Sequence, residues 1–478
     1  MLKRFSIYSF SAFIPVILGF FLFPIFTNYL TPEEYGIRAI ILLAVVVFNV
    51  VSDFGTNWII RYKFFRFTNN DDLSTYISSL VLVSLFLKIV MSVALFSLKN
   101  LVFPLVFSEW NDFYSQLLNI QILVFLLTFI NNIVYPVLIL ENKALEYTTL
   151  LLFSFFVNSG ISLLLVIHFN LGLISLFYAE LARGIFYVIL SFIFLRGKIK
   201  FKFDSQVLKD IVKIGLPALP KNLFEQVTIN INSYAISVYM GVGDLGQFQK
   251  SEFVFNGLKG FQRSFSQTFS TNNIKRLTER GEDLETGRNV ILFIYFISVV
   301  LVFTNFFMRD IFILLAVNSD FYVCATYAPL IGFSILFSGF SDMFVNNILV
   351  SGKTYLFTIK SIIGGIAVVL LNIVLIPKFG VYGAIFATII SSIISVGIEI
   401  FISETFLKSK TKISYFSWIL IILTTLVIFI LNESFHVKSI YSKVLILLIY
   451  TIFIGLIDRF FVRAVNWELI IRKIQNLI

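Results

Sequence analysis

Long apolar segments recur from one end of this sequence to the other, and they constrain its fold more than any other feature. Each is roughly 20 to 25 residues long, enough to cross about 30 Å of hydrocarbon as a helix. Strands of a membrane β-barrel would instead alternate over about ten residues. The sequence therefore predicts an all-α polytopic membrane protein with about 14 transmembrane helices. The segments lie at approximately 6–29, 37–60, 74–98, 116–140, 146–168, 171–195, 211–240, 249–271, 290–309, 322–350, 355–376, 381–404, 414–431 and 443–460.

The composition agrees with a lipid environment. The chain is 58% hydrophobic and only 13% charged, whereas a soluble domain carries about 25% charged residues. The single cysteine, Cys324, excludes an intramolecular disulfide and a multi-cysteine metal site. His168 and His436 fall in or beside predicted loops and are expected to be interfacial polar residues. No metal or cofactor is expected, apart from a coupling ion discussed below.

Lys and Arg residues are distributed unevenly between the two predicted sides of the membrane. The side that holds both termini carries 25 of them and the opposite side 7. Because cytoplasmic loops retain positive charge, both termini are predicted to be cytoplasmic. The net charge of +10 then reflects topology and attraction to anionic lipid headgroups. It is not evidence for a nucleic acid partner.

One polar corner occurs twice, 210 residues apart. "NYLTPEEYG" at 28–36 and "VYMGVGDLG" at 238–246 share the spacing of their Tyr, acidic and Gly residues. Lys143 and Lys353, and likewise Phe169 and Phe379, are separated by the same offset. The interval predicts two six-helix repeats that cross the membrane in the same direction, a plan found in alternating-access transporters. The alternative is that apolar segments always align to some degree.

This repeat suggests an organisation into lobes. We expect a six-helix lobe at 1–195, a basic cytoplasmic linker at 196–210 and a second lobe at 211–407. Residues 408–478 hold two further helices without a counterpart and a basic cytoplasmic tail.

Three motifs, in this order, carry a family resemblance: "LTPEEYG", "IGLPALPKN" and "LIPKFGVYGAIFAT". The chain resembles the Wzx-type O-antigen flippases of the polysaccharide transporter family, in the multidrug/oligosaccharidyl-lipid/polysaccharide exporter superfamily. This resemblance implies a two-lobed carrier in the bacterial inner membrane. Such a carrier moves an undecaprenyl-pyrophosphate-linked oligosaccharide from the cytoplasmic to the periplasmic leaflet.

Ionisable residues inside the predicted spans are the first candidates for a site, because each costs about 2.5–3.5 kcal/mol at a helix centre. In segment 211–240, Lys221 and Glu225 lie on one helical face with Asn232. In segment 249–271, one face carries Glu252, Asn256, Lys259 and Arg263. These groups are expected to face each other, water or a charged ligand.

We hypothesise that Lys221, Lys259 and Arg263 line a cationic cavity for the pyrophosphate or for anionic sugars. Further candidate cations are Arg183 and Arg61, and the candidate polar lining consists of Asn222, Asn232, Asn256, Asn49 and Asn57. The alternative is that Lys221 with Glu225, and Glu252 with Lys259 or Asn256, form internal pairs that only hold helices in register.

Buried carboxylates are the candidates for proton or Na⁺ coupling, because burial favours their neutral form. They are Asp53, Glu225, Glu252 and Glu180. The alternative for each is a fixed salt bridge, and Glu180 lies three residues before Arg183, close enough to pair.

The expected function is therefore a lipid-linked oligosaccharide flippase, not an enzyme. Alternatives are a cation-coupled multidrug exporter, a lipid II flippase and, less favoured, a membrane glycan polymerase, which needs a longer extramembrane loop. Expected partners are the lipid-linked substrate, membrane lipids, and the polysaccharide polymerase and chain-length regulator of the same pathway.

Overall fold

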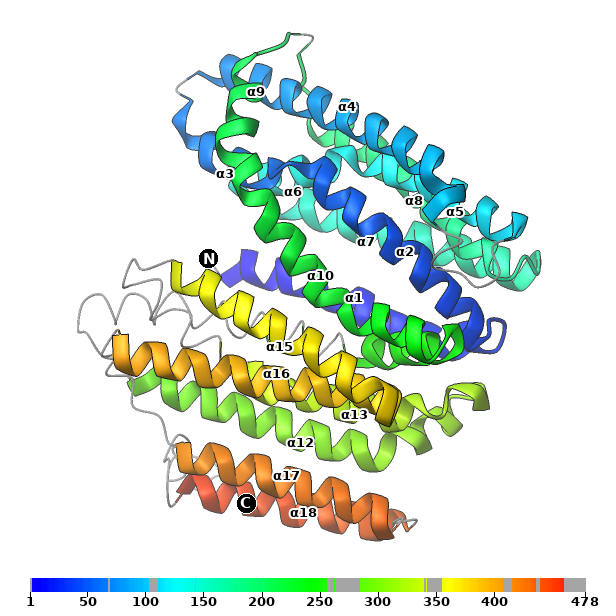
Figure 1. Ribbon diagram of the computed structural model, residues 1–478, viewed down its shortest axis with the longest axis vertical. Coiled ribbons are helices and arrows are strands. Elements are labelled where there is room, and N and C mark those ends of the chain that lie inside the picture. The colour runs from blue at the N-terminus through cyan, green and yellow to red at the C-terminus, as the bar shows by residue number, and fades with distance from the viewer. Residues whose placement is uncertain are drawn as a thin grey trace. The chain divides into compact units, whose positions relative to one another are not determined.

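The structure is a computed structural model (Figure 1). It describes residues 2–67, 69–102, 111–141, 143–200, 202–255, 259, 262, 284–338, 341, 355–406, 415–435 and 439–459. Regular structure within these residues is helical throughout. Among them, 11 helices are long and apolar enough to cross a membrane, and the stretch Ile14–Thr27 is a shorter apolar helix. The predicted all-α polytopic membrane fold is confirmed, and the spans are consistent with the predicted 14.

The chain divides into two compact units, Met1–Gly246 and Gln247–Ile478. The helix expected to open the second six-helix lobe therefore packs with the first unit. The lobe boundaries derived from the repeat stay a prediction.

The helices of the first unit surround one apolar core. Buried residues of this core, among them Ile60, Tyr76, Ile133, Leu150 and Tyr187, come from five different helices. The helices of the unit are α1 (Leu2–Thr27), α2 (Pro32–Asp53), α3 (Thr56–Lys63), α4 (Asn70–Val102), α5 (Asp112–Leu127), α6 (Asn131–Leu140), α7 (Ala144–Leu163), α8 (Ile174–Phe194), α9 (Gln206–Asp210) and α10 (Leu216–Tyr239).

Two of the predicted continuous segments in the first unit are interrupted. Between α2 and α3 the chain turns at Phe54 and Gly55, which have φ values of 39° and 68°. This left-handed backbone ends a helix and is readily adopted by glycine. Between α5 and α6, a 3₁₀ turn at Thr128–Ile130 takes the place of α-helix. Both interruptions are polar or glycine-containing and both lie near the cavity described below.

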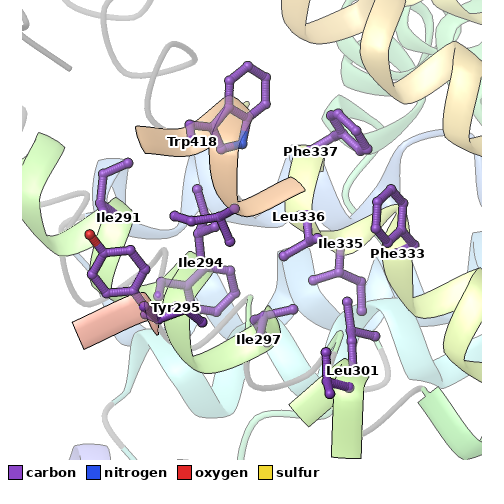
Figure 2. Packing of buried hydrophobic residues seen from close by; sticks show 14 of the residues in the cluster. Ile291, Ile294, Tyr295, Ile297, Leu301, Phe333, Ile335, Leu336, Phe337 and Trp418 are labelled. Carbon is purple, nitrogen blue, oxygen red and sulfur yellow. The ribbon is translucent and has the colours of Figure 1, made fainter. Parts of the chain in front are cut away.

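The second unit packs its last two helices into its core. Figure 2 shows Ile294 of one helix below Trp418, and Leu301 of the same helix beside Ile335. The rings of Phe337 and Trp418 meet edge to face at 5.8 Å. The helices expected to lie beyond the repeat therefore share the main core of this unit. Among its helices are α12 (Leu284–Leu314), α13 (Cys324–Phe333), α15 (Tyr355–Phe379), α16 (Val381–Phe401), α17 (Tyr415–Phe435) and α18 (Ile440–Ile457).

The first polar corner begins α2 with a capping box. Thr31 Oγ1 accepts a hydrogen bond from the Glu34 backbone N–H at 3.3 Å, and Glu34 Oε2 accepts one from the Thr31 N–H at 2.9 Å. These two bonds satisfy backbone donors that a helix leaves unpaired at its start. Glu34 Oε1 also accepts from the Leu173 N–H at 3.1 Å, just before α8. The corner thus holds the start of α2 against a segment that lies 139 residues further along the chain.

The two corners of the repeat contact each other. A methyl group at Gly36 would lie 1.7 Å from the carbonyl oxygen of Val242, and one at Gly246 would lie 1.8 Å from that of Pro32. The offset of 210 residues maps Pro32 onto Val242 and Gly36 onto Gly246. The contact is therefore reciprocal, as at a two-fold axis, where each partner supplies the same surface.

The predicted basic linker is attached to the first unit by hydrogen bonds. The Asp204 N–H donates to Ser79 Oγ at 2.7 Å, and the Tyr76 hydroxyl donates to Asp210 Oδ2 at 2.7 Å. Lys63 Nζ lies 3.0 Å from the same Asp210 carboxylate. The linker is thus a docked part of the unit.

Candidate functional site: a polar cavity in the first unit

Helix α10 lies directly against α2 in the first unit (Figure 1). Near the end of α10, the Tyr234 hydroxyl donates to the carbonyl of Leu43, in the middle of α2, at 2.9 Å. At the start of α10, a methyl group on Gly215 would lie 2.0 Å from the Phe54 carbonyl oxygen. The close approach at Gly215 fixes the first turn of α10 beside the left-handed turn that ends α2.

A cavity of about 330 Å³ opens beside this turn. Its walls come from the end of α2, the start of α3, α6 and the first half of α10. Amide, hydroxyl and carboxylate groups dominate the wall, which is unusual for helices that cross lipid. The lining residues are Val50, Asp53, Gly55, Thr56, Asn57, Asn132, Asn222 and Gln226.

Asp53 is the only ionisable residue of the described lining. It is paired with Lys88, which is buried and does not itself line the cavity. Lys88 Nζ lies 3.3 Å from Asp53 Oδ1, and the Lys88 side chain is 1% exposed while that of Asp53 is 28% exposed. Lys88 Nζ also donates to Asn49 Oδ1 at 2.7 Å and lies 4.4 Å from the Phe125 ring centre. The ammonium is therefore held by a carboxylate, an amide and an aromatic face.

Neighbouring polar groups orient this pair. Asn132, on α6, lines the cavity together with Asp53. The Thr128 hydroxyl donates to the Phe125 carbonyl at 2.7 Å, and its oxygen lies 3.4 Å from Asn49 Oδ1. The interruption between α5 and α6 thus places both Thr128 and Asn132 beside the end of α2.

A second cation lies next to the cavity. The Arg61 Nε–H donates to Asn57 Oδ1 at 2.8 Å, one turn further along α3. Arg61 is exposed, so its remaining guanidinium donors are available to a ligand. Asn57 is thereby fixed with its oxygen toward Arg61.

The chemistry of this wall suits a ligand rich in hydroxyl groups. Each side-chain amide offers both donors and an acceptor, and an ionised carboxylate accepts several hydrogen bonds. The single negative charge of Asp53 is balanced by Lys88 behind it. The described wall is therefore polar and close to neutral.

The structure brings together five of the residues predicted from the sequence. Asp53, Asn57 and Asn222 line the cavity. Asn49 accepts a hydrogen bond from Lys88, the partner of Asp53, and Arg61 donates one to Asn57. They come from three helices separated by up to about 170 residues, from 49 to 222. That these residues bind substrate remains a prediction.

The other predicted residues of the first unit lie elsewhere. Glu180, buried, forms its ion pair with Arg38 of α2, so the structure does not assign it the Arg183 partner suggested by their spacing. Arg183 is half-buried, and its Nε has no hydrogen-bond partner among the described residues. Asn232 lies on α10, two turns beyond the lining residues.

In the second unit, Lys259 Nζ lies 3.6 Å from Glu252 Oε1. This is the pairing named by the alternative in which the charges hold a helix in register. Arg263 and Asn256 lie outside the described residues, as do the side chains of Lys221 and Glu225.

Sequence reasoning missed Lys88, Asn132 and Thr56. A signal existed for Lys88, which stands alone in the apolar run "LVLVSLFLKIVMSVALF". A lone lysine at such a depth costs about 2.5–3.5 kcal/mol, so it demands a partner. The sequence does not name that partner, because Asp53 lies on another helix.

Solved structures share this fold. A lipid II flippase MurJ in an inward closed conformation aligns with a TM-score of 0.73 at 16% identity, covering 94% of this chain and 97% of that one. An inward-facing multidrug resistance MATE transporter of the MOP superfamily aligns with a TM-score of 0.64 at 12% identity, covering 81% and 93%. A MOP superfamily transporter from Pyrococcus furiosus, described as having a binding pocket of reverse polarity, aligns with a TM-score of 0.55 at 13% identity, covering 85% and 96%.

The sequence comparisons add the family. No curated protein sequence matches this chain. A family model described as polysaccharide biosynthesis protein matches residues 25–326, more than half of the chain. The chain is therefore a multi-pass membrane protein with the fold of MOP superfamily transporters, and it belongs to this family of polysaccharide biosynthesis proteins.

Proposed function

We propose that this protein is a flippase for a lipid-linked oligosaccharide, such as an undecaprenyl-pyrophosphate-linked O-antigen unit of the Wzx type. The observation that carries the proposal is the polar cavity beside Asp53, enclosed by membrane helices of a polysaccharide biosynthesis protein. The fold shared with a lipid II flippase supports the same reading.

The physical requirement of flipping explains why such a cavity is needed. A sugar hydroxyl that leaves water without a replacement hydrogen bond costs several kcal/mol, roughly 2–7 depending on the reference state. An oligosaccharide has many hydroxyls, so it crosses only where the wall supplies donors and acceptors. Asn57, Asn132, Asn222 and Gln226 supply both.

The negatively charged pyrophosphate needs cationic partners, and we include these in the proposal. Arg61 presents an exposed guanidinium next to the cavity. Lys221, Lys259 and Arg263 are proposed to serve the same end of the substrate. Arginine suits phosphate oxygens because its donors form a planar fork.

Coupling, orientation and partners complete the proposal. Asp53 is the candidate for proton or Na⁺ coupling that lies at the cavity, and a coupling ion would compete with Lys88 for its carboxylate. We place both termini in the cytoplasm of a bacterium, with the protein in the inner membrane. The polymerase and chain-length regulator of the same pathway are proposed as partners.

Flipping of a labelled lipid-linked oligosaccharide into proteoliposomes tests the proposal. Wild-type protein is expected to expose the glycan to an impermeant reagent, and Asn132→Ala and Asn222→Ala are expected to slow this step. Lys378→Ala, at an exposed position of the second unit, is the control. Lipid II and a cationic drug serve as competing substrates. Transport of the drug without the glycan, or no flipping above empty vesicles, would overturn the proposal.

A further inference from the structure

A second polar cavity, of about 570 Å³, lies wholly within the second unit. It is formed where four helices end or begin: the last turns of α12 and α17 and the first turns of α13 and α18. Candidate membrane spans stop at the same places, at Leu314 and Glu433, and restart at Ser319 and Ile440. The cavity therefore lies at the level where lipid headgroups meet the ends of membrane helices.

Two fixed contacts frame this cavity. Lys443, whose side chain is 8% exposed, is paired with Asp310. Asn432 Nδ2 donates to Asn305 Oδ1 at 2.8 Å and to the Asn305 carbonyl at 3.2 Å. Both contacts join α12 to α17 or α18, so the wall is held in place by the core of the unit.

Two charges in the wall are left over. Arg309 and Glu433 both line the cavity and are exposed. In the part of the chain that the structure describes, neither side chain forms an ion pair or a hydrogen bond. With Lys443 and Asp310 already paired, the lining offers one positive and one negative group to a ligand, and its formal charge is zero.

A ligand that matches this wall carries both signs. An anion would be attracted by Arg309 but repelled by Glu433. A cation would be attracted by Glu433 but repelled by Arg309. A phosphate beside a primary ammonium satisfies both, through charge-assisted bonds to the guanidinium fork and to the carboxylate. About one turn beyond Arg309, α12 ends in two large apolar residues that offer a surface for acyl chains. These are Ile313, which is 54% exposed, and Leu314, which is 82% exposed.

We infer that this cavity binds the headgroup of a zwitterionic phospholipid of the phosphatidylethanolamine type. Arg309 binds its phosphate and Glu433 its ammonium. The site is independent of the oligosaccharide cavity, because all of its residues belong to the second unit. It gives α17 and α18, which the repeat does not account for, a role in lipid contact.

The test uses the full chain purified in detergent and exchanged into equal amounts of phosphatidylethanolamine and phosphatidylglycerol, with retained lipid counted by native mass spectrometry. Wild-type protein is expected to retain phosphatidylethanolamine. Arg309→Gln is expected to lose about tenfold in retention, the effect of removing one charge-assisted bond. Lys378→Gln, which removes an exposed cation at the end of α15, is expected to change nothing.

Charge reversal separates a headgroup site from a structural role. Glu433→Lys is expected to switch the preference to phosphatidylglycerol, whereas a variant that only loosened the fold would retain less of both lipids. Equal retention of the two lipids by wild-type protein would overturn the inference. An Arg309→Gln variant that retains as much phosphatidylethanolamine as wild type would also overturn it. So would soluble phosphoethanolamine that binds delipidated protein as tightly as phosphatidylethanolamine does.

Discussion

Gly246 lies so close to Pro32 that a methyl group on it would be 1.8 Å from the Pro32 carbonyl oxygen. The same relationship, one repeat offset away, joins Gly36 to Val242 at 1.7 Å. Both obstacles are backbone atoms, which a side-chain rotation does not remove. Contacts this short tolerate only hydrogen, which explains why glycine stands at the last position of both corners.

Gly36→Ala and Gly246→Ala are therefore each expected to lower stability by about 1–3 kcal/mol, the range for overpacked sites. The double variant is expected to lose less than the sum, because separating the corners once relieves both clashes. Thermal unfolding in detergent measures this. Gly160→Ala and Gly397→Ala are matched helical controls with nothing within 4 Å of the added methyl. Additive losses would contradict a shared, reciprocal contact.

The Asp53–Lys88 pair is expected to respond asymmetrically to substitution. Asp53→Asn leaves an ammonium that is 1% exposed without its counterion, which costs about 3 kcal/mol or more. Lys88→Met costs less, because the Asp53 carboxylate still reaches water in the cavity. The Asp53→Asn/Lys88→Met double variant is expected to recover stability.

A double-mutant cycle of thermal unfolding checks this asymmetry. The coupling energy between the two positions is expected to be about 1–3 kcal/mol. Equal losses in both single variants would contradict the asymmetry, and losses that add in the double variant would show that the two side chains do not depend on each other. Asp72→Asn, an exposed carboxylate of α4, is the control.

Glu34 is expected to matter more than its capping partner Thr31. Thr31→Ala removes one capping hydrogen bond and costs about 1 kcal/mol. Glu34→Ala removes the reciprocal bond and also the bond from the Leu173 N–H, so it is expected to cost about 1 kcal/mol more. Unfolding temperatures of the two variants decide the order. Equal losses would mean that the link to the segment before α8 contributes nothing.

Asp210 is expected to keep the basic linker inaccessible to protease. It accepts from Tyr76 and pairs with Lys63, so Asp210→Ala leaves the linker with fewer attachments. Trypsin, which cleaves after Lys and Arg, is then expected to cut between 196 and 209 faster than in wild-type protein. Time courses read by mass spectrometry measure the rate. An unchanged rate would show that the other attachments of the linker, which include the bonds to Ser78 and Ser79 and the ion pairs of Lys198 with Glu141 and of Lys200 with Asp71, are sufficient to hold it.

Much of the fold follows from local sequence properties. Segment length and apolarity predicted the membrane helices, since the transfer of each segment into lipid depends on its own residues. The repeated corner predicted a structural equivalence that the reciprocal contact of Gly36 and Gly246 displays. The candidate carboxylate Asp53 was also visible, because a charge in an apolar segment is costly wherever it lies.

Pairings and groupings required the tertiary structure. The spacing of Glu180 and Arg183 suggested a pair, yet Glu180 forms its ion pair with Arg38, which lies on another helix. The pairing of Lys88 with Asp53 and the place of α10 in the first unit likewise depend on how the helices pack. The chain by itself determined which residues are too costly to face lipid. Which partner each one meets depends on contacts between helices far apart in sequence, and these exist only once the helices are packed.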